Sequence, residues 1–313
     1  MNKEPVSIVV QSTGIDVVPA IIQALKRLKP DWHYGAWPCE IRADYAIVWK
    51  PPSELFERNP LLKAAINYGA GVDAILSMES VPAHIPIIRL EDAGMAQQMA
   101  EYALYGVIHH HRHMQIYNAQ QRDRVWLQHE DRANLQRPVV GVMGLGEMGG
   151  HVAAKIAAFG YEVRGWSKSK RAVEGVQCFA GSEQFSEFLS ATHVLVCMLP
   201  LTESTRGLVG AKTLAALPHG SFLINAGRGD HMIEADVLAA LQSGQLAGAL
   251  LDVFAPEPLP QDNALWSHPN VIVTPHIAAT TPIREACAQI VDKIERMERG
   301  ELVSGVVDRS VGY

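Results

Sequence analysis

Short apolar runs alternate with segments of helical periodicity along almost the whole chain of 313 residues. In the first hundred residues, strand candidates lie at residues 6–12, 43–49 and 85–90, and helical patterns lie around 17–28 and 59–68. A helical stretch without proline then runs from about Gly94 to beyond Tyr117. Such a helix is long enough to bridge two domains.

Six more strand-like runs follow, at residues 137–144, 161–166, 192–199, 220–227, 247–254 and 270–277. Helix-like segments such as HVAAKIAAF and EADVLAALQSG lie between them. Strands rich in Val, Ile and Leu that alternate with helices are typical of a parallel sheet covered on both faces. The pattern therefore predicts an α/β fold. The amphipathic segment 283–302 is expected to pack on a domain.

Length and composition narrow the class of protein. The length suggests two domains of roughly 100–200 residues each. Hydrophobic residues make up 48% and charged residues 19%, enough for a large core, and the formal net charge of −6 argues against general nucleic-acid binding. No apolar run approaches the ~18 residues of a membrane span, and four widely separated cysteines suggest reduced thiols, so we expect a cytoplasmic protein without membrane contact.

A glycine motif of G-x-G-x-x-G spacing follows the strand candidate 137–144 and opens a helix. Such glycines permit a tight turn, a close approach of backbone to a pyrophosphate, and close packing of helix on strand. The helix start also offers free N–H groups to phosphates. The alternative is a glycine-rich turn without a ligand. The predicted cofactor contacts in this turn are Gly144, Leu145, Gly146, Glu147, Met148 and Gly149.

About twenty residues further on, dinucleotide-binding folds usually carry an acidic residue that binds a ribose hydroxyl. Here the end of the next strand instead reads Trp166, Ser167, Lys168, Ser169 and Lys170, and Arg171 follows. A carboxylate would repel a 2′-phosphate, whereas hydroxyl and ammonium groups hydrogen-bond it and balance its charge. The sequence therefore favours NADPH over NADH. The alternative is that these cations form only a solvated turn.

Three polar residues, Arg228, Glu257 and His276, follow the last strand candidates. The carboxyl ends of parallel strands border the ligand crevice of a doubly wound sheet, so all three can face one site. Arginine can bind a carboxylate and polarise a carbonyl, histidine can donate a proton to a forming alkoxide, and glutamate can orient the imidazole. Singly, each has an ordinary alternative as a capping, turn or buried hydrogen-bonded residue.

These segments, in this order, resemble the D-isomer-specific 2-hydroxyacid dehydrogenases. The resemblance rests on the glycine turn, LPLTESTRGLVG, INAGRGD, ALLDVFAPEPLP and TPHIAATT, and it covers nearly the whole chain. It is closest to those members that reduce glyoxylate and hydroxypyruvate. It implies two Rossmann-like doubly wound domains, with a cofactor domain of residues 98–284 inserted into a flavodoxin-like substrate domain of residues 1–97 and 285–313.

The resemblance also implies roles for individual residues. His276 would be the acid/base, Glu257 its partner and Arg228 the substrate-binding catalyst, while the Ala70 and Gly71 amides would hold the substrate carboxylate. Further cofactor contacts would come from Leu199, Pro200, Ala226 and Asp252. Pocket walls would come from Trp49 and Met95, for which ordinary core packing is the alternative.

The expected activity is NADPH-dependent reduction of a small 2-keto acid by a homodimer. Two rivals remain: a related dehydrogenase that takes a bulkier keto acid or NADH, and a non-catalytic dinucleotide-sensing protein of the same fold. The run HHHRH, residues 109–113, suggests a metal site, but only His109 and His113 share a helix face and no ligand set is complete. We therefore expect no metal, and a polar helix surface or dimer interface there.

Overall fold

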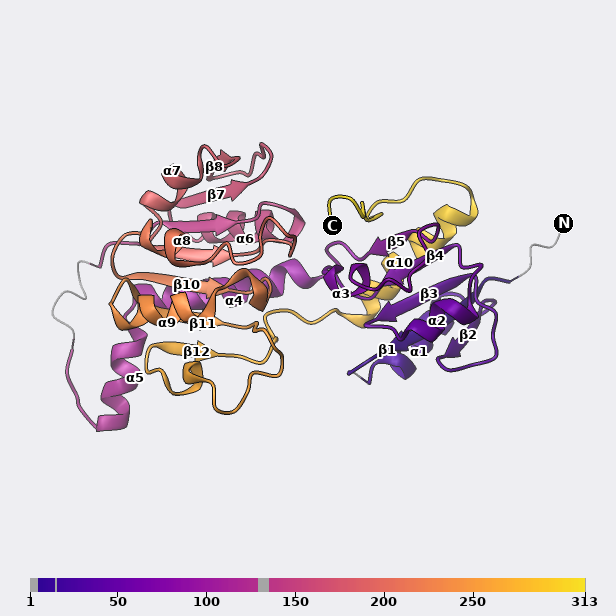
Figure 1. Cartoon of the computed structure of the whole chain (residues 1–313), viewed down its shortest axis with the longest axis horizontal. Helices are drawn as coiled ribbons and strands as arrows, with labels where there is room; N and C mark the ends of the chain where they lie inside the picture. The colour runs from indigo at the N-terminus through magenta and orange to yellow at the C-terminus, as the bar shows by residue number, and fades with distance from the viewer. Residues whose placement is uncertain (1–4, 15, 129–134, 313) are drawn as a thin grey trace. The chain divides into compact units, whose positions relative to one another are not determined.

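The structure is a computed structural model that describes residues 5–14, 16–128 and 135–312. The described residues up to Gly94 and from Thr281 onward form one compact unit, and those from Met95 to Thr280 form a second (Figure 1). The second unit is thus inserted into the first along the chain. The sequence predicted these boundaries after residue 97 and before residue 285, which is a few residues later in the chain than the structure has them.

The first unit contains a five-stranded parallel sheet with the strand order β2-β1-β3-β4-β5. Its strands are β1 (Ser7–Ser12), β2 (His33–Ala36), β3 (Tyr45–Trp49), β4 (Ala64–Asn67) and β5 (Ile87–Arg89). The order reverses between β1 and β3, as in flavodoxin-like sheets. Its helices are α1 (Val18–Leu28), α2 (Ser53–Arg58), α3 (Asp73–Leu76) and α10 (Ile283–Glu298). The helix α10 packs beside α1, as its apolar stripe predicts.

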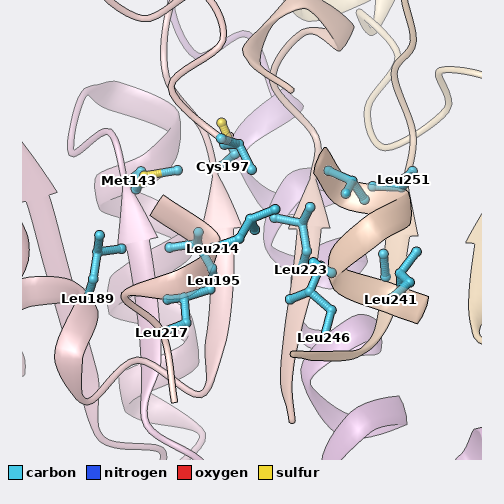
Figure 2. Close-up of a cluster of buried hydrophobic side chains, with 14 of the residues drawn as sticks. Met143, Leu189, Leu195, Cys197, Leu214, Leu217, Leu223, Leu241, Leu246 and Leu251 are labelled. Atoms are coloured by element: carbon cyan, nitrogen blue, oxygen red, sulfur yellow. The ribbon is translucent and has the colours of Figure 1, made fainter. Parts of the chain in front are cut away.

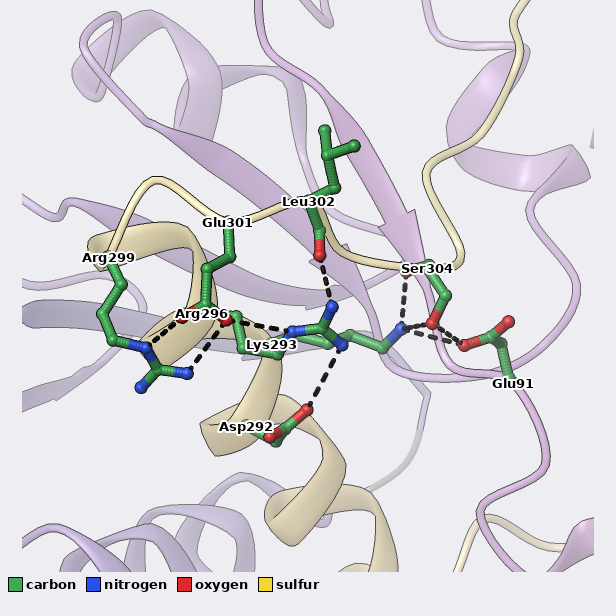
Figure 3. A network of polar contacts seen from close by, with 8 residues as sticks. All are labelled: Glu91, Asp292, Lys293, Arg296, Arg299, Glu301, Leu302 and Ser304. Atoms are coloured by element: carbon green, nitrogen blue, oxygen red, sulfur yellow. Dashed lines mark hydrogen bonds and ion pairs between the residues drawn. The ribbon is translucent and has the colours of Figure 1, made fainter.

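A network of hydrogen bonds and ion pairs connects the segment after α10 with the loop after β5 (Figure 3). The Lys293 side chain is 3% exposed, and its ammonium group donates to Glu91 Oε2 at 3.0 Å and to the carbonyl of Ser304 at 2.6 Å. Burial acts to raise the pKa of Glu91, but hydrogen bonds from Ser304 and Lys293 outweigh it and hold this pKa below its ordinary value. The ammonium is therefore buried with its partners in place.

The second unit contains a seven-stranded parallel sheet with the order β12-β11-β10-β9-β6-β7-β8. Its strands are β6 (Val140–Met143), β7 (Val163–Ser167), β8 (Val176–Ala180), β9 (Val194–Cys197), β10 (Ser221–Asn225), β11 (Leu246–Leu251) and β12 (Val271–Val273). The order reverses between β6 and β9, the arrangement of a Rossmann fold. The predicted α/β fold class with two doubly wound parallel sheets is confirmed.

Helices cover both faces of the second sheet. Successive strand residues point to opposite sides, so each strand contributes buried apolar side chains to both faces. The helices are α4 (Met95–His111), α5 (Met114–Asp123), α6 (Glu147–Ala158), α7 (Phe185–Ser190), α8 (Ala211–Ala215) and α9 (Glu234–Gln242), with 3₁₀ turns η2 (Gly229–His231) and η3 (Ala264–Ser267). On β9, Leu195 and Cys197 belong to the cluster under α8 and α9 (Figure 2). Val194 and Val196 belong to the cluster under α4 and α6. Burial of each leucine contributes about 1.5–3 kcal/mol.

Two of the predicted helices are wrong. The segment 59–68 contains the buried strand β4 instead of a helix, because it pairs with β3 and β5 on its two sides. The stretch beyond Gly94 is two helices: His113 takes a left-handed backbone with φ of 54° and separates α4 from α5. The strands β2 and β8 were not predicted. Across the described residues, no helix is long and apolar enough to cross a membrane.

The histidines at the end of α4 pack inside the second unit, so the expected polar surface is wrong for His109, which is 5% exposed. The His110 ring stacks on Phe222 with centroids 5.1 Å apart, and His111 Nδ1 lies 3.0 Å from the Tyr161 hydroxyl. Burial, followed by the charges of neighbouring histidines with His113 first, lowers the pKa of His110 to about 4. These side chains therefore serve as neutral packing groups.

Candidate active site

The carboxyl ends of β10, β11 and β12 lie side by side at one edge of the second sheet. Their last residues, Asn225, Leu251 and Val273, are register partners. The chain then leaves each strand in the same direction because the strands are parallel. The loops that follow carry Arg228, Glu257 and His276, so the sheet brings these three loops to one edge, as the strand-end rule predicts.

His276 and Glu257 form a direct pair. The distance from His276 Nδ1 to Glu257 Oε2 is 2.9 Å, and the two side chains are 41% and 32% exposed. The other carboxylate oxygen of Glu257 accepts the Phe254 amide at 3.1 Å. Both oxygens of the Glu257 carboxylate therefore have a hydrogen-bonding partner. His276 has a left-handed backbone with φ of 56°, a conformation that an L-residue keeps only when its surroundings impose it.

The Asp252 carboxylate holds the loop that carries His276 and so imposes this backbone conformation. This carboxylate is buried and accepts three hydrogen bonds from the loop: Thr274 Oγ1 at 2.6 Å and the amides of Ile277 and Ala278 at 2.8 Å each. The hydroxyl of Tyr102, on α4, lies 2.6 Å from Thr274 Oγ1, and burial raises the pKa of Tyr102. Sequence reasoning placed Asp252 beside the cofactor and missed its role in folding this loop.

The turn that carries Arg228 is held by its backbone. The Arg228 amide donates to His231 Nδ1 at 3.0 Å, and its carbonyl accepts Asn225 Nδ2 at 3.0 Å. A Cβ atom on Gly229 would lie 2.0 Å from the carbonyl carbon of Phe254, so this turn rests directly on the loop that leads to Glu257. Sequence reasoning also missed His231, because its contact with the carbonyl of Pro200 is visible only in the folded chain.

The glycine turn between β6 and α6 has the shape that a dinucleotide requires. Gly144 has φ of 98°, and a Cβ atom on Gly149 would lie 1.8 Å from the Gly144 carbonyl oxygen, so helix and turn touch at backbone distance. A Cβ atom on Gly146, the N-cap of α6, would meet nothing within 4 Å. The turn is therefore compact where it packs and open where a pyrophosphate would approach the helix N-terminus.

Neighbouring residues fit the same ligand. Leu145 is 4% exposed and its side chain packs on Gly165, so it can offer a ligand only its backbone, whereas Glu147 is exposed and Met148 half-buried. Leu199 and Ala226 are buried at the ends of β9 and β10. The strand β9 borders the point where the strand order reverses, which is where doubly wound sheets bind their ligands, and β10 pairs with β9.

The end of β7 lacks an acidic side chain. The Trp166 indole donates to the carbonyl of Gly181 at 2.9 Å, and Ser167, 9% exposed, donates its hydroxyl proton to the carbonyl of Ser169 at 2.8 Å. Lys168, Ser169, Lys170 and Arg171 are exposed. The strand therefore ends in a short hydroxyl-bearing turn with cations in solvent, which suits a 2′-phosphate better than a ribose hydroxyl.

The predicted substrate residues divide between the two units: Trp49, Ala70 and Gly71 belong to the first, Met95 and Arg228 to the second. In the first unit, Asn67 Nδ2 donates to the carbonyls of Gly69 and Gly71 at 3.1 and 2.9 Å. A Cβ atom on Gly69 would lie 2.7 Å from the Trp49 ring. Trp49 thus packs on the loop whose amides were predicted to hold the carboxylate.

Met95 is 6% exposed, which agrees with core packing as much as with a pocket wall. Within residues 5–14, 16–128 and 135–312, no three His, Cys, Asp or Glu side chains gather in a way that would hold a metal ion.

The second unit matches the family model described as D-isomer specific 2-hydroxyacid dehydrogenase, NAD binding domain, over residues 104–278. The chain belongs to the D-isomer specific 2-hydroxyacid dehydrogenase family, and the predicted resemblance is confirmed. It is an oxidoreductase of this family.

Relatives with assigned names match nearly the whole chain. Glyoxylate/hydroxypyruvate reductase A of Klebsiella pneumoniae (strain 342) is 46% identical over 302 residues, which are 94% of this chain and 96% of the relative. A D-isomer specific 2-hydroxyacid dehydrogenase from Xanthobacter autotrophicus Py2, solved with NADPH and MES, is 41% identical, with a TM-score of 0.93 over 98% of this chain and 99% of that one.

An NADPH-dependent glyoxylate/hydroxypyruvate reductase from Sinorhizobium meliloti was solved with NADP and sulfate. It is 36% identical, with a TM-score of 0.89 over 98% of this chain and 100% of that one.

Proposed function

We propose that the chain catalyses NADPH-dependent reduction of small 2-keto acids, of glyoxylate to glycolate and of hydroxypyruvate to D-glycerate. The observation that carries this proposal is the His276–Glu257 pair at 2.9 Å, on the strand-end edge that also carries Arg228. A protein that only sensed a dinucleotide would have no use for this pair. The names of the Klebsiella and Sinorhizobium relatives support the choice of keto acid.

The residues that would hold NADPH lie along the reversal point of the second sheet. The pyrophosphate would approach the open side of Gly146. The 2′-phosphate would accept hydrogen bonds from Ser169 and from Ser167, whose hydroxyl would exchange its bond to the Ser169 carbonyl for one to the phosphate. Lys168 and Lys170 would balance its charge. The backbone near Leu199, Pro200 and Ala226 would line the cofactor, and Asp252 would lie close to its nicotinamide carboxamide. Bound NADPH would supply the hydride.

The histidine would supply the proton. Nδ1 of His276 faces Glu257, so Nε2 is the ring atom left to protonate the substrate carbonyl oxygen. The contact with the Glu257 carboxylate fixes the orientation of the ring for that transfer. General acid catalysis of this kind contributes about 10²–10⁴-fold in rate.

Substrate binding would fall to Arg228 and to backbone amides. The Arg228 guanidinium would bind the keto-acid carboxylate and polarise the carbonyl. The amides of Ala70 and Gly71 donate to no other described residue, and such amides in a small-residue loop suit an anion. Trp49 and Met95 would form apolar pocket walls.

The test is a kinetic panel. Initial rates are measured with glyoxylate, hydroxypyruvate, pyruvate and a branched 2-keto acid, each with NADPH and with NADH. We expect the highest kcat/KM for glyoxylate or hydroxypyruvate with NADPH. A preference for the branched acid or for NADH would identify a different dehydrogenase of the family, and no turnover with any pair would refute an enzymatic role.

We also propose a homodimer that uses α5. None of the residues of this helix is buried, and α5 projects from the second unit (Figure 1). The residues after it expose apolar side chains: Val125 is 50% exposed, Trp126 96% and Leu127 64%. Apolar side chains gathered in this way mark an association surface. Light scattering should give twice the mass of one chain, whereas the mass of a single chain would contradict the proposal.

A further inference from the structure

We propose that His231 is a positioning residue that couples the backbone of Arg228 to the loop after β9. The inference rests on the proposed function, because it concerns how Arg228 and the cofactor loop are held relative to each other. The His231 side chain is completely buried in η2, between the turn that carries Arg228 and the residues that follow β9.

Both ring nitrogens of His231 face a partner. Nδ1 accepts the Arg228 amide at 3.0 Å, so the ring proton is on Nε2, and Nε2 lies 3.3 Å from the carbonyl oxygen of Pro200. A single neutral imidazole thus connects the amide of the proposed substrate-binding arginine with a carbonyl of the proposed cofactor loop. No other common side chain of similar size offers an acceptor and a donor on opposite edges of one rigid ring.

The carbonyl oxygen of Pro200 has two side-chain partners, of which His231 is one. It also accepts the Thr205 hydroxyl at 2.8 Å, and that hydroxyl oxygen in turn accepts the amide of Thr202 at 2.8 Å. The segment from Pro200 to Thr205 is therefore folded around one carbonyl oxygen. The second donor to this oxygen is His231, which places the loop relative to Arg228.

The imidazole is not needed to hold the η2 turn. The backbone already closes it, since the His231 amide donates to the Arg228 carbonyl at 3.1 Å and the Val209 amide donates to the His231 carbonyl at 2.9 Å. The Gly207 amide donates to the Asp230 carbonyl at 2.8 Å. A phenylalanine would keep an aromatic ring at this place without the two polar ring atoms, which we propose carry the coupling. The ring lies on Gly227, where a Cβ atom would be 2.9 Å from Nδ1.

The two contacts can be separated by a matched pair of substitutions. In His231→Asn the side-chain oxygen can take the place of Nδ1 and keep the Arg228 contact, but the chain is too short to reach Pro200. In His231→Gln the amide nitrogen can take the place of Nε2 and keep the Pro200 contact, but the acceptor for Arg228 is lost. His231→Phe removes both contacts. All are compared with wild type for thermal unfolding, NADPH Kd by fluorescence titration, and glyoxylate kinetics.

We expect His231→Asn to weaken NADPH binding about tenfold with a glyoxylate KM within about twofold of wild type. We expect His231→Gln to lower kcat/KM for glyoxylate about 10- to 100-fold with nearly unchanged NADPH Kd, because a small misplacement of a binding group costs rates of this order. His231→Phe should show both defects. Equal changes in both constants for the Asn and Gln variants would overturn the coupling, as would wild-type constants for His231→Phe.

An Arg228→Gln background separates this inference from the proposed function. If His231 acts through Arg228, adding His231→Gln to Arg228→Gln should lower kcat/KM by less than about twofold more. Fully additive losses would refute positioning through Arg228. If Arg228→Gln alone keeps wild-type turnover, the proposed role of Arg228 fails, while the NADPH Kd of His231→Asn still tests the Pro200 contact without any turnover.

Discussion

Gly146 and Gly149 lie in the same turn, yet alanine should affect stability at Gly149 and NADPH binding at Gly146. A Cβ atom at Gly149 would lie 1.8 Å from the Gly144 carbonyl oxygen, whereas real Cβ contacts essentially never fall below 3.0 Å. Turn and helix α6 must therefore separate by about 1.2 Å, the difference between these distances. A Cβ atom at Gly146 would meet nothing within 4 Å, and its φ of −71° is accessible to alanine.

Overpacking of this kind costs about 1–3 kcal/mol. For a unit of this size each kcal/mol lowers Tm by about 2–4 °C. Gly149→Ala should therefore lower the unfolding temperature of the second unit by roughly 2–12 °C. Gly146→Ala should leave Tm within about 2 °C of wild type, because the loss of chain entropy in the unfolded state offsets the weaker N-cap.

NADPH affinity should separate the two variants in a second way. The added methyl of Gly146→Ala would occupy the space where the pyrophosphate approaches, so we expect Kd to rise about tenfold or more. The assays are differential scanning calorimetry and quenching of tryptophan fluorescence by NADPH. A Gly146→Ala protein that binds NADPH like wild type would refute the proposed phosphate site, and an unchanged Tm for Gly149→Ala would refute the backbone contact.

Three further predictions address the cofactor strand, the buried histidines and the segment after α10. Ser167→Asp should lower kcat/KM with NADPH and raise it with NADH, because a carboxylate repels a 2′-phosphate and binds a ribose hydroxyl. The measurement is steady-state kinetics with both cofactors, and an unchanged cofactor preference would contradict this prediction. The pKa of His110 is lowered to about 4 in the fold, so the unfolded chain takes up the proton first as pH falls below about 6.5, and stability present above that pH is lost toward pH 4. Urea unfolding should show a loss of about 2 kcal/mol between about pH 7.5 and pH 5 that His110→Gln removes; the same loss in the variant would exclude His110 as its source. Glu91→Gln should destabilise by about 3 kcal/mol or more, because the Lys293 ammonium, 3% exposed, loses its carboxylate; Lys293→Met should cost less, since Glu91 is 31% exposed, and the opposite order in urea unfolding would contradict this account.

The elements that the sequence predicts correctly are those whose pattern is set by their own residues. The continuous apolar run of Val194–Cys197 follows from burial on both faces of the sheet, and the helix Ile283–Glu298 follows from its apolar stripe. By contrast, Ala64–Asn67 contains alanines that favour a helix, and only its place between β3 and β5 makes it a strand. The break at His113 has neither glycine nor proline to signal it.

The same distinction applies to the candidate site. Arg228, Glu257 and His276 could be predicted because each follows a strand of a parallel sheet, and the strand-end rule needs no tertiary contact. The contact of Tyr102 with Thr274 joins residues 172 positions apart and has no local signal. His231 likewise reads as an ordinary turn residue until the fold places it against Pro200. Residues that position others are therefore the ones that sequence reasoning missed.

The central claim, that His276 supplies the proton during keto-acid reduction, is tested most directly by single-turnover reduction of glyoxylate in His276→Ala saturated with NADPH. The proposal predicts a fall in the rate of NADPH oxidation of about 10²–10⁴-fold, with an NADPH Kd within about twofold of wild type. A rate within tenfold of wild type, at unchanged Kd, would contradict the assignment of His276 as the general acid.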